Sequence, residues 1–531
     1  MRLFIPFLLS LLIACQPAQP PKAPETSQLG DLGHDFTISE AARPYFDKGL
    51  LLLHSFEYED ARDEFEKARR ADGNELMAYW GLAMTHYKAL WGLQDVVAGR
   101  EVMGLLGDNE EERLSKAENK LEADFWKGIE ILYGDGELAE RNKKYVKHMA
   151  RVYGANPGNL EVAAFYSLGL MWADYKDQEN LNLSSQVAAG IVKENPTHPG
   201  ALHYMIHAND NPDFAEVAIE AANSYAKVAP DAAHALHMPS HIYVALGMWK
   251  EVVSSNDDSY NASVNRMKEK GLSGRARGYH SLAWLHYGYL QLGQYEKAAD
   301  LLRQMIEFHG ESTADESYLI MMQNQQRIES GEWPESLEFQ DVSDPAIKVG
   351  MEGKAKIHFL RSLFAYDRKD LTGVETQIEG LKAHLAAAKL VVTDDGVALC
   401  SAGPTRYAPD EESIKRTQVV IYQMEAMAAM LREEDDGEES KLKMAVALEE
   451  EVGYDSGPPF IAYPSFEQYG DWLLIQNRPE EALEQFEKSL SSRTNRTKAL
   501  LGKLKALEAL GRSAEVEEVK GLLLKLEVRL S

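Results

Sequence analysis

The sequence predicts an all-α protein built as a superhelical solenoid of helix pairs. Apolar residues recur at helical spacing through most of the 531-residue chain, and strand-like alternation is rare. The pair His203 and His207 recurs as His237 and His241, at an offset of 34 residues in both cases. A repeat of that length is one two-helix unit. The chain is also too long for a single hydrophobic core, so its length predicts either about three ordinary domains or one elongated repeat array.

The first helix pair shows the packing pattern behind this prediction. Small residues at Gly49 and Ala61 let two helices approach, and Tyr45 and Phe65 fill the space between them. Together with Leu52 and Ala68, these spacings resemble the tetratricopeptide consensus. The resemblance covers most of residues 37–531 and implies a concave face lined by the first helix of each pair.

Further repeat units follow in order along the chain. They are expected from about Glu75, at 159–181, at 199–232, at 233–266, from Tyr279, and again from Phe466 to the C-terminus. Residues 108–153 are helical but depart from the consensus, and 311–451 is less regular, with polar loops near 333–345 and 391–411. We therefore expect two lobes, 37–310 and 311–531, joined near 311–345.

Composition excludes some classes of partner. The net charge is −28, and the acidic residues are spread over predicted helix faces. Nucleic acid and anionic lipid surfaces both attract Lys- and Arg-rich proteins, so neither is an expected partner of the folded body.

The N-terminus has the features of an export signal. Arg2 precedes an apolar stretch, Leu3 to Ile13, that is too short to span a bilayer as a mature helix. The next residues, Ala14-Cys15, complete a string that resembles the lipobox of bacterial lipoproteins. The resemblance implies cleavage after residue 14 and lipidation of Cys15, and Gln16 rather than Asp fits an outer-membrane anchor facing the periplasm. Plain secretion with an incidental cysteine is the alternative.

Residues 15–36 are expected to form a Pro-rich tether between the lipid and the folded body. No later run is apolar enough to span a membrane. The second cysteine, Cys400, lies in a predicted loop and is expected to be a half-buried small residue, because one cysteine forms neither an internal disulfide nor a Cys-rich metal site.

Histidines provide the candidate functional site. Eight of fifteen lie between His198 and His286. In tetratricopeptide register, the two H-x-x-x-H pairs take positions 5 and 9 of successive repeats, and His234 and His280 take position 2. All of these positions face the concave side. We therefore predict that His203, His207, His237, His241, His234 and His280 converge there, with Glu161, which aligns with His203 one repeat earlier.

Imidazole clusters of this kind suit zinc, copper or iron. No Glu follows His203 or His237, so neither helix carries the H-E-x-x-H pattern of zinc proteases. The alternative is a metal-free groove with polar side chains. His286 falls at a packing position and is expected to be structural, and His54 is expected at the surface or in the groove.

Pro239 lies inside the predicted helix that carries the second histidine pair. Either the helix starts near Asp231 and bends at Pro239, which we favour, or it begins only at Pro239. A bend would turn His237 and His241 toward a shared ion.

Two strings, His234-Ala235-Leu236-His237-Met238-Pro239-Ser240-His241-Ile242 and Tyr279-His280-Ser281-Leu282, also resemble those of a family of bacterial tetratricopeptide lipoproteins. This resemblance implies fold and location but no reaction. The sequence shows no phosphate-binding glycine loop and no nucleophile elbow. It therefore favours an envelope binding module with a transition-metal site, or with a peptide or protein segment in its groove. A metal-dependent hydrolase or oxidase and a metal-free interaction scaffold are the alternatives.

Overall fold

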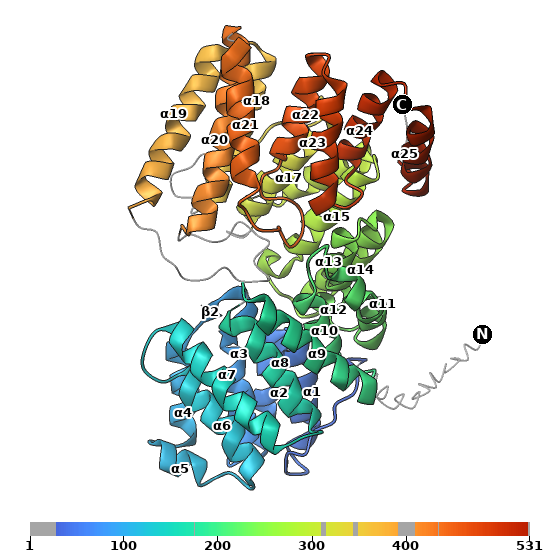
Figure 1. Ribbon diagram of the computed structural model, residues 1–531. Coiled ribbons are helices and arrows are strands. Elements are labelled where there is room, and N and C mark those ends of the chain that lie inside the picture. Colours follow the sequence, from blue (N-terminus) through green and yellow to red (C-terminus); the bar gives the residue numbers. More distant parts are fainter. Residues whose placement is uncertain are drawn as a thin grey trace, which may run out of the picture.

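The computed structural model describes residues 28–174, 176–309, 315–342, 349–390, 409–433 and 435–528. Within them the chain is an all-α solenoid, which confirms the predicted fold class. One two-residue hairpin, β1 (Tyr87–Lys88) with β2 (Leu93–Gln94), interrupts the helices of the described part. In Figure 1 the helices α1–α9 form a lower lobe, α15–α25 an upper lobe, and α10–α14 the connection between them.

The lower lobe begins with the helix pairs that the sequence pattern indicates. Its helices are α1 (Arg43–His54), α2 (Tyr58–Ala71), α3 (Leu76–Thr85), α4 (Val96–Leu106), α5 (Glu110–Leu114), α6 (Lys120–Leu132), α7 (Leu138–Ala155), α8 (Leu160–Ala173) and α9 (Gln178–Glu194), with a 3-10 turn η1 (Ala89–Trp91).

The connecting segment carries most of the clustered histidines. Its elements are α10 (Pro199–Ala208), η2 (Ala215–Ala218), α11 (Ile219–Val228), α12 (Ala233–His237), α13 (Pro239–Ala245), α14 (Trp249–Glu269) and η3 (Gly274–Ala276).

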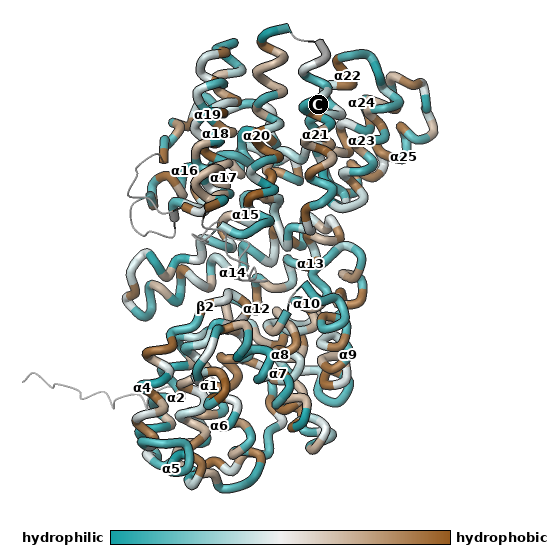
Figure 2. The backbone as a smooth tube through the Cα atoms, turned by 60° about the vertical axis from the view of Figure 1, so that its left-hand side comes forward, coloured by the Kyte–Doolittle hydropathy of each residue, from teal (hydrophilic) through white to brown (hydrophobic). Residues whose placement is uncertain are grey.

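The upper lobe completes the chain. Its helices are α15 (Tyr279–Gln291), α16 (Tyr295–Glu307), α17 (Asp315–Ser330), α18 (Met351–Asp367), α19 (Leu371–Ala388), α20 (Glu411–Arg432), α21 (Asp435–Glu449), α22 (Ser465–Ile475), α23 (Pro479–Ser492), α24 (Thr497–Ala509) and α25 (Ser513–Lys525). Figure 2 shows hydrophobic and hydrophilic residues interspersed along these helices, as is expected of amphipathic helices.

The contacts of one aromatic ring explain the helix-pair geometry. Phe65 on α2 is fully buried, and a Cβ added at Gly49 on α1 would lie 2.9 Å from its ring. At Gly81 on α3 the added Cβ would lie 2.4 Å from the same ring. Glycines on both neighbours therefore let three helices close around one phenylalanine. The same arrangement recurs in the upper lobe, around Phe486.

Pro239 lies where the predicted helix is divided into two segments. α12 forms before it, Met238 keeps right-handed helical dihedrals, and α13 begins at Pro239. The Met238 N–H still bonds the His234 carbonyl at 3.0 Å. The prediction that the helix begins only at Pro239 is therefore wrong. Helical turns run on both sides of an interruption, and they begin at Ala233 rather than near Asp231.

The lobes meet at α15. The hydrophobic core of the lower lobe runs from Leu29 to Leu292, whereas a second cluster begins at Tyr279 and runs to Val349. α15 contributes to both. The first hydrophobic cluster therefore gives way to the second within α15. This position is N-terminal to the 311–345 segment, where the sequence predicts the junction of the lobes.

Residues 28–36, the described part of the expected tether, lie against the body. Leu29 and Phe36 are 1% and 3% exposed, and the Asp31 N–H bonds the Thr197 carbonyl at 3.1 Å. The expected signal segment, Cys15 and Cys400 lie outside the described residues. Among the described helices, none combines the length and the apolar character needed to cross a bilayer.

Candidate metal centre

Six histidines from four helices meet where the two lobes join. α10 supplies His203 and His207, α12 supplies His234 and His237, and α13 and α15 supply His241 and His280. They divide into two triads: first, His203, His207 and His234; second, His237, His241 and His280. Within each triad the candidate ligand atoms lie within 4.8 Å of one another. The repeat register therefore predicts the convergence, and the structure adds the division into two sets.

The first triad is fixed through His203. The Nδ1 of His203 lies 2.7 Å from the backbone carbonyl of His54, and its Nε2 lies 3.2 Å from the Nε2 of His234. The His207 ring centroid lies 4.8 Å from that of His203. The Phe56 ring packs on His203 at 4.2 Å and covers this side of the triad.

The second triad has more polar contacts that hold its rings in place. The Nε2 of His237 lies 3.2 Å from the Nε2 of His241 and 3.0 Å from the Nε2 of His280. The Nδ1 of His237 lies 2.7 Å from the Asn256 Oδ1, and the Nδ1 of His241 lies 2.6 Å from the Asp210 Oδ2.

The sequence reasoning missed these two polar partners. The Asn256 amide is oriented by its own bond to the Val252 carbonyl at 2.8 Å, so its oxygen faces the histidine. Asn256 follows the fully buried Val252 by four positions, so both residues lie on the inward face of α14. The helical spacing in the sequence could therefore have identified Asn256. Asp210 follows α10 in irregular backbone, where no periodicity identifies it.

These partners determine which ring nitrogen carries the proton. A carbonyl, an amide oxygen and a carboxylate only accept hydrogen bonds, so the Nδ1 atoms of His203, His237 and His241 must donate. In the neutral ring the Nε2 atom then bears a lone pair. The Nε2 atoms of His237 and His241 face one another at 3.2 Å, and in the neutral rings both present a lone pair there.

Burial favours the neutral ring at His203, His237 and His280. Desolvation lowers the pKa of His203 to about 3 and that of His280 to about 3, and it lowers the pKa of His237 far below its usual range. Neighbouring imidazoles add to the effect, because a second positive charge beside the first is unfavourable. Neutral Nε2 atoms directed at one another are an arrangement that a metal ion stabilises.

The spacing also fits ligation. Two ligands at 2.0–2.1 Å from one ion lie about 2.9 Å apart at a right angle and about 3.4 Å apart at the tetrahedral angle. The observed separations of 3.0 and 3.2 Å fall between these limits. Metal-binding histidines also typically donate a hydrogen bond from the other ring nitrogen, here Nδ1, to a neighbouring acceptor that fixes the ring.

The triads are more enclosed than the sequence predicts. Four of the histidines, His203, His207, His237 and His241, are 0–2% exposed, whereas His234 and His280 are half-buried. Trp284 covers the second triad, with its ring centroid 4.9 Å from His237 and 4.7 Å from His241. Each triad therefore reaches the solvent through one histidine.

Glu161 is not in either triad. It forms a third group with His54 and His198, in which its Oε2 lies 2.8 Å from the Nε2 of His54 and its Oε1 lies 3.3 Å from the Nε2 of His198. The expectation that His54 is a surface or groove residue is wrong, because its exposure is 0%. The α1 helix, which carries His54, packs directly on α10.

This third group is held together by a hydrogen bond from His54 to Glu161 and an ion-pair contact between Glu161 and His198. The Nδ1 of His198 accepts from the Ala201 N–H at 3.2 Å, so in the neutral ring Nε2 carries the proton and cannot ligate. His54 is likewise placed to donate to the carboxylate, with Tyr204 at 2.9 Å from its other nitrogen. Burial raises the pKa of Glu161, but the two imidazoles outweigh it and lower that pKa overall, so it is a carboxylate.

His286 has the structural role expected of its packing position. It is fully buried, and its Nε2 lies 3.1 Å from the Gln326 Oε1. Burial lowers its pKa to about 4. It is thus a matched control for the triad histidines.

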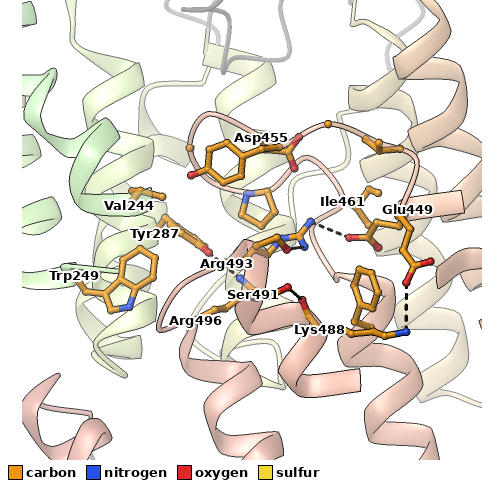
Figure 3. Close-up of a pocket in the computed structure, with 18 residues that line it drawn as sticks. Val244, Trp249, Tyr287, Glu449, Asp455, Ile461, Lys488, Ser491, Arg493 and Arg496 are labelled. Carbon is orange, nitrogen blue, oxygen red and sulfur yellow. Dashed lines mark hydrogen bonds and ion pairs between the residues drawn. The ribbon is translucent and has the colours of Figure 1, made fainter. Parts of the chain in front are cut away.

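A separate pocket of about 300 Å³ lies between α14, α15 and the loop that follows α21 (Figure 3). Its cations are paired: Arg493 with Glu449 at 2.9 Å, and Lys488 with Glu450 at 3.5 Å. Gly457, on the pocket wall, approaches Trp284 so closely that an added Cβ would lie 2.4 Å from the ring. The pocket wall is therefore next to Trp284, the tryptophan that covers the second triad.

Comparisons with known proteins add limited information. No family model matches the sequence, and the search of curated proteins finds no match. Solved structures that match include the human IFIT1 dimer with PPP-AAAA, at 12% identity and TM-score 0.35, covering 94% of this chain and 99% of that chain. Ypp1 matches at 12% identity and TM-score 0.38, covering 92% of this chain and 82% of that one.

The tetratricopeptide domain of P58(IPK) also matches, at 12% identity and TM-score 0.22, covering 89% of this chain and 99% of that chain. The packing of helices around Phe65, rather than these superpositions, shows that the described part of the chain is a solenoid of paired helices.

Proposed function

We propose that this protein is a binding module of the bacterial cell envelope whose folded body holds a transition metal in the two histidine triads. The observation that carries the proposal is the close approach of two Nε2 atoms whose rings are held through Nδ1. His237 and His241 each donate through Nδ1 to a fixed acceptor and direct Nε2 at one another over 3.2 Å.

A metal-free polar groove explains this arrangement less well. A groove that recognises peptides through histidines needs those histidines at its surface, whereas His203 and His207 are 0% and 1% exposed. Burying polar groups without satisfying partners costs about 1–3 kcal/mol each. An ion that accepts the Nε2 lone pairs removes that cost.

A metal-dependent enzyme, a hydrolase or an oxidase, is the second candidate. It is favoured by the half-buried His234 and His280, which place one edge of each triad toward the solvent. Three protein ligands with an open fourth position are typical of catalytic metal sites. Zinc, copper and iron are all compatible with imidazole ligands.

The proposed location rests on the sequence. Cys15 at a lipobox-like string would anchor the chain to the outer membrane, with the body in the periplasm. A protein or peptide partner would then be recruited by the remaining solenoid surface, as repeat proteins commonly do.

The test is metal retention in a double variant. Replacing His203 and His237 together with Ala removes one ligand from each triad, and we expect the purified protein to lose its bound metal while its helical circular dichroism is unchanged. Elemental analysis of untagged protein measures the metal. The matched control is His286→Ala, which removes an equally buried histidine outside the triads and is expected to keep the metal. Equal metal content in the double variant and the wild type would refute the proposal.

A further inference from the structure

The two triads are separate sets of ligands that lie side by side. Ring centroids of His207 and His241 are 5.7 Å apart, and those of His234 and His237 are 6.2 Å apart. Each of these pairs joins the first triad to the second. The close contacts between ring nitrogens, by contrast, are within a triad: 3.2 Å in the first, and 3.0 and 3.2 Å in the second.

One ion cannot use all six rings in this arrangement. Nitrogens bound to one ion at 2.0–2.1 Å lie at most about 4.2 Å from one another, which is twice the bond length. The candidate ligand atoms gather as two sets of three, not as one set of six. Two ions with three imidazoles each use every histidine of the cluster and leave each ion an open position.

Each triad also has its own means of fixing its rings. The first relies on the backbone carbonyl of His54, and the second relies on Asn256 and Asp210. Since such outer partners orient metal ligands, each triad contains rings that are held for ligation without help from the other triad.

The positive charge of two bound ions would favour an anion as a further ligand. As metal ligands, the six imidazoles are neutral donors, and Asp210, which contacts His241 at 2.6 Å, is the carboxylate nearest to them. Two divalent ions in this enclosed site would therefore carry an excess of positive charge, which a low-dielectric interior disfavours. A small anion such as hydroxide in the open positions reduces that excess.

Resting on the proposed function, we infer that the site is dinuclear: His203, His207 and His234 hold one transition-metal ion, His237, His241 and His280 hold a second, and a small anion occupies the open positions between them. Ions in protein two-metal sites lie about 3.5–4 Å apart, which is the range in which one anion can bridge both.

The experiment measures stoichiometry in the full folded chain. Metal-depleted protein is loaded with Cu(II), the divalent ion for which nitrogen sites have the highest affinity, and the bound copper per chain is determined after desalting. We expect two ions in the wild type and one in each of the variants His234→Gln and His280→Gln. Both substitutions are at half-buried residues, which spares the core, and the double variant is expected to bind none.

Electron paramagnetic resonance provides the second readout. Two neighbouring Cu(II) ions couple, so the wild type should give a weakened or half-field signal, and each single variant the ordinary signal of one isolated Cu(II). Azide added to the wild type should change the spectrum by entering the open positions. Independent, uncoupled signals from two bound ions would refute the dinuclear arrangement.

A matched pair at Asn256 tests the second triad without removing a ligand. Asn256→Leu deletes the acceptor for the His237 Nδ1–H and should weaken one of the two sites about 10- to 100-fold. Asn256→Asp keeps an acceptor oxygen and should restore most of the affinity. Equal affinity in both variants would count against the proposed role of Asn256.

The outcomes separate this inference from the function it rests on. One copper per wild-type chain, lost in either single variant, would leave a metal-binding protein with one shared ion and would overturn the dinuclear centre. No bound copper in the wild type would overturn both.

Discussion

Lys356 is a buried cation whose charge depends on a small group of neighbours. It is 4% exposed on α18, and its ammonium lies 5.1 Å above the Phe460 ring. The nearby carboxylates Glu352 and Asp455 are engaged by Arg416, at 2.9 and 2.7 Å. Burial therefore dominates and lowers the pKa of Lys356 from 10.5 to about 8, although the two carboxylates act to raise it.

This shift makes stability depend on pH. The unfolded chain keeps the lysine protonated up to about pH 10.5, whereas the folded chain releases the proton near pH 8. Since the unfolded state then binds more protons, the free energy of unfolding rises with pH in this window. We expect Lys356→Met to lose about 1.5 kcal/mol of that rise between pH 8 and 9.5. Urea denaturation of metal-depleted wild type and variant at the two pH values measures it, and parallel pH profiles would contradict it.

The surroundings of a residue also limit what sequence predicts about the candidate metal centre. Repeat register identifies His203, His237 and His280, because consensus positions specify which side chains face inward. It does not identify Asp210, which irregular backbone brings to His241. It also places Glu161 beside the triads, whereas packing of α1 on α10 gives that carboxylate to His54 instead. Contacts between elements far apart in the sequence are absent from a local register.

At the scale of the element, glycines set how closely helices pack. Gly81 on α3 faces Phe65 of α2, and Gly190 on the exposed side of α9 has no atom within 4 Å of an added Cβ. Both are helical, so the backbone gains similarly from alanine at either position. The two sites differ in whether space exists for a methyl group.

Opposite effects on stability are therefore expected from the same substitution. Gly81→Ala would force the methyl group to within 2.4 Å of the Phe65 ring and should lower the free energy of unfolding by about 1–3 kcal/mol. Gly190→Ala should raise it by up to about 1 kcal/mol, because alanine is the better helix former. Chemical denaturation followed by circular dichroism compares them. Stabilisation by Gly81→Ala would show that α2 and α3 are not held at this spacing.

Element boundaries show where sequence reasoning is strong and where it fails. The consensus spacing around Gly49 and Phe65 predicts the first helix pair well, because that spacing is itself the packing contact. The interruption at Pro239 is less predictable. A proline removes one hydrogen bond wherever it lies, but whether the preceding turn stays helical depends on tertiary contacts, and here α12 packs on α14.

On the scale of the whole molecule, one arginine joins the two ends of the upper lobe. Arg496 is fully buried at the start of α24, 2.5 Å from Glu467 of α22 and 2.7 Å from Glu329 of α17. Its Nη1 donates to the Tyr287 hydroxyl of α15 at 2.8 Å. Next to it, the Asn495 carbonyl accepts from the Trp249 indole at 2.9 Å. The C-terminal helices thus close onto the segment that carries the second triad.

Removing this arginine should loosen that closure. Arg496→Ala leaves two buried carboxylates without their cation, and breaking a buried ion pair in this way typically costs about 3–5 kcal/mol. We expect hydrogen exchange to accelerate in α22–α25 before it does in α1–α9, because the contacts that are lost all lie in the upper lobe. A triple variant that also carries Glu329→Gln and Glu467→Gln should recover much of the loss, since neutral amides need no counter-ion. Mass spectrometry of deuterium uptake measures the exchange of each helix. Uniform acceleration across both lobes would contradict this assignment, because it would mean that α22–α25 cannot loosen without the lower lobe unfolding with them.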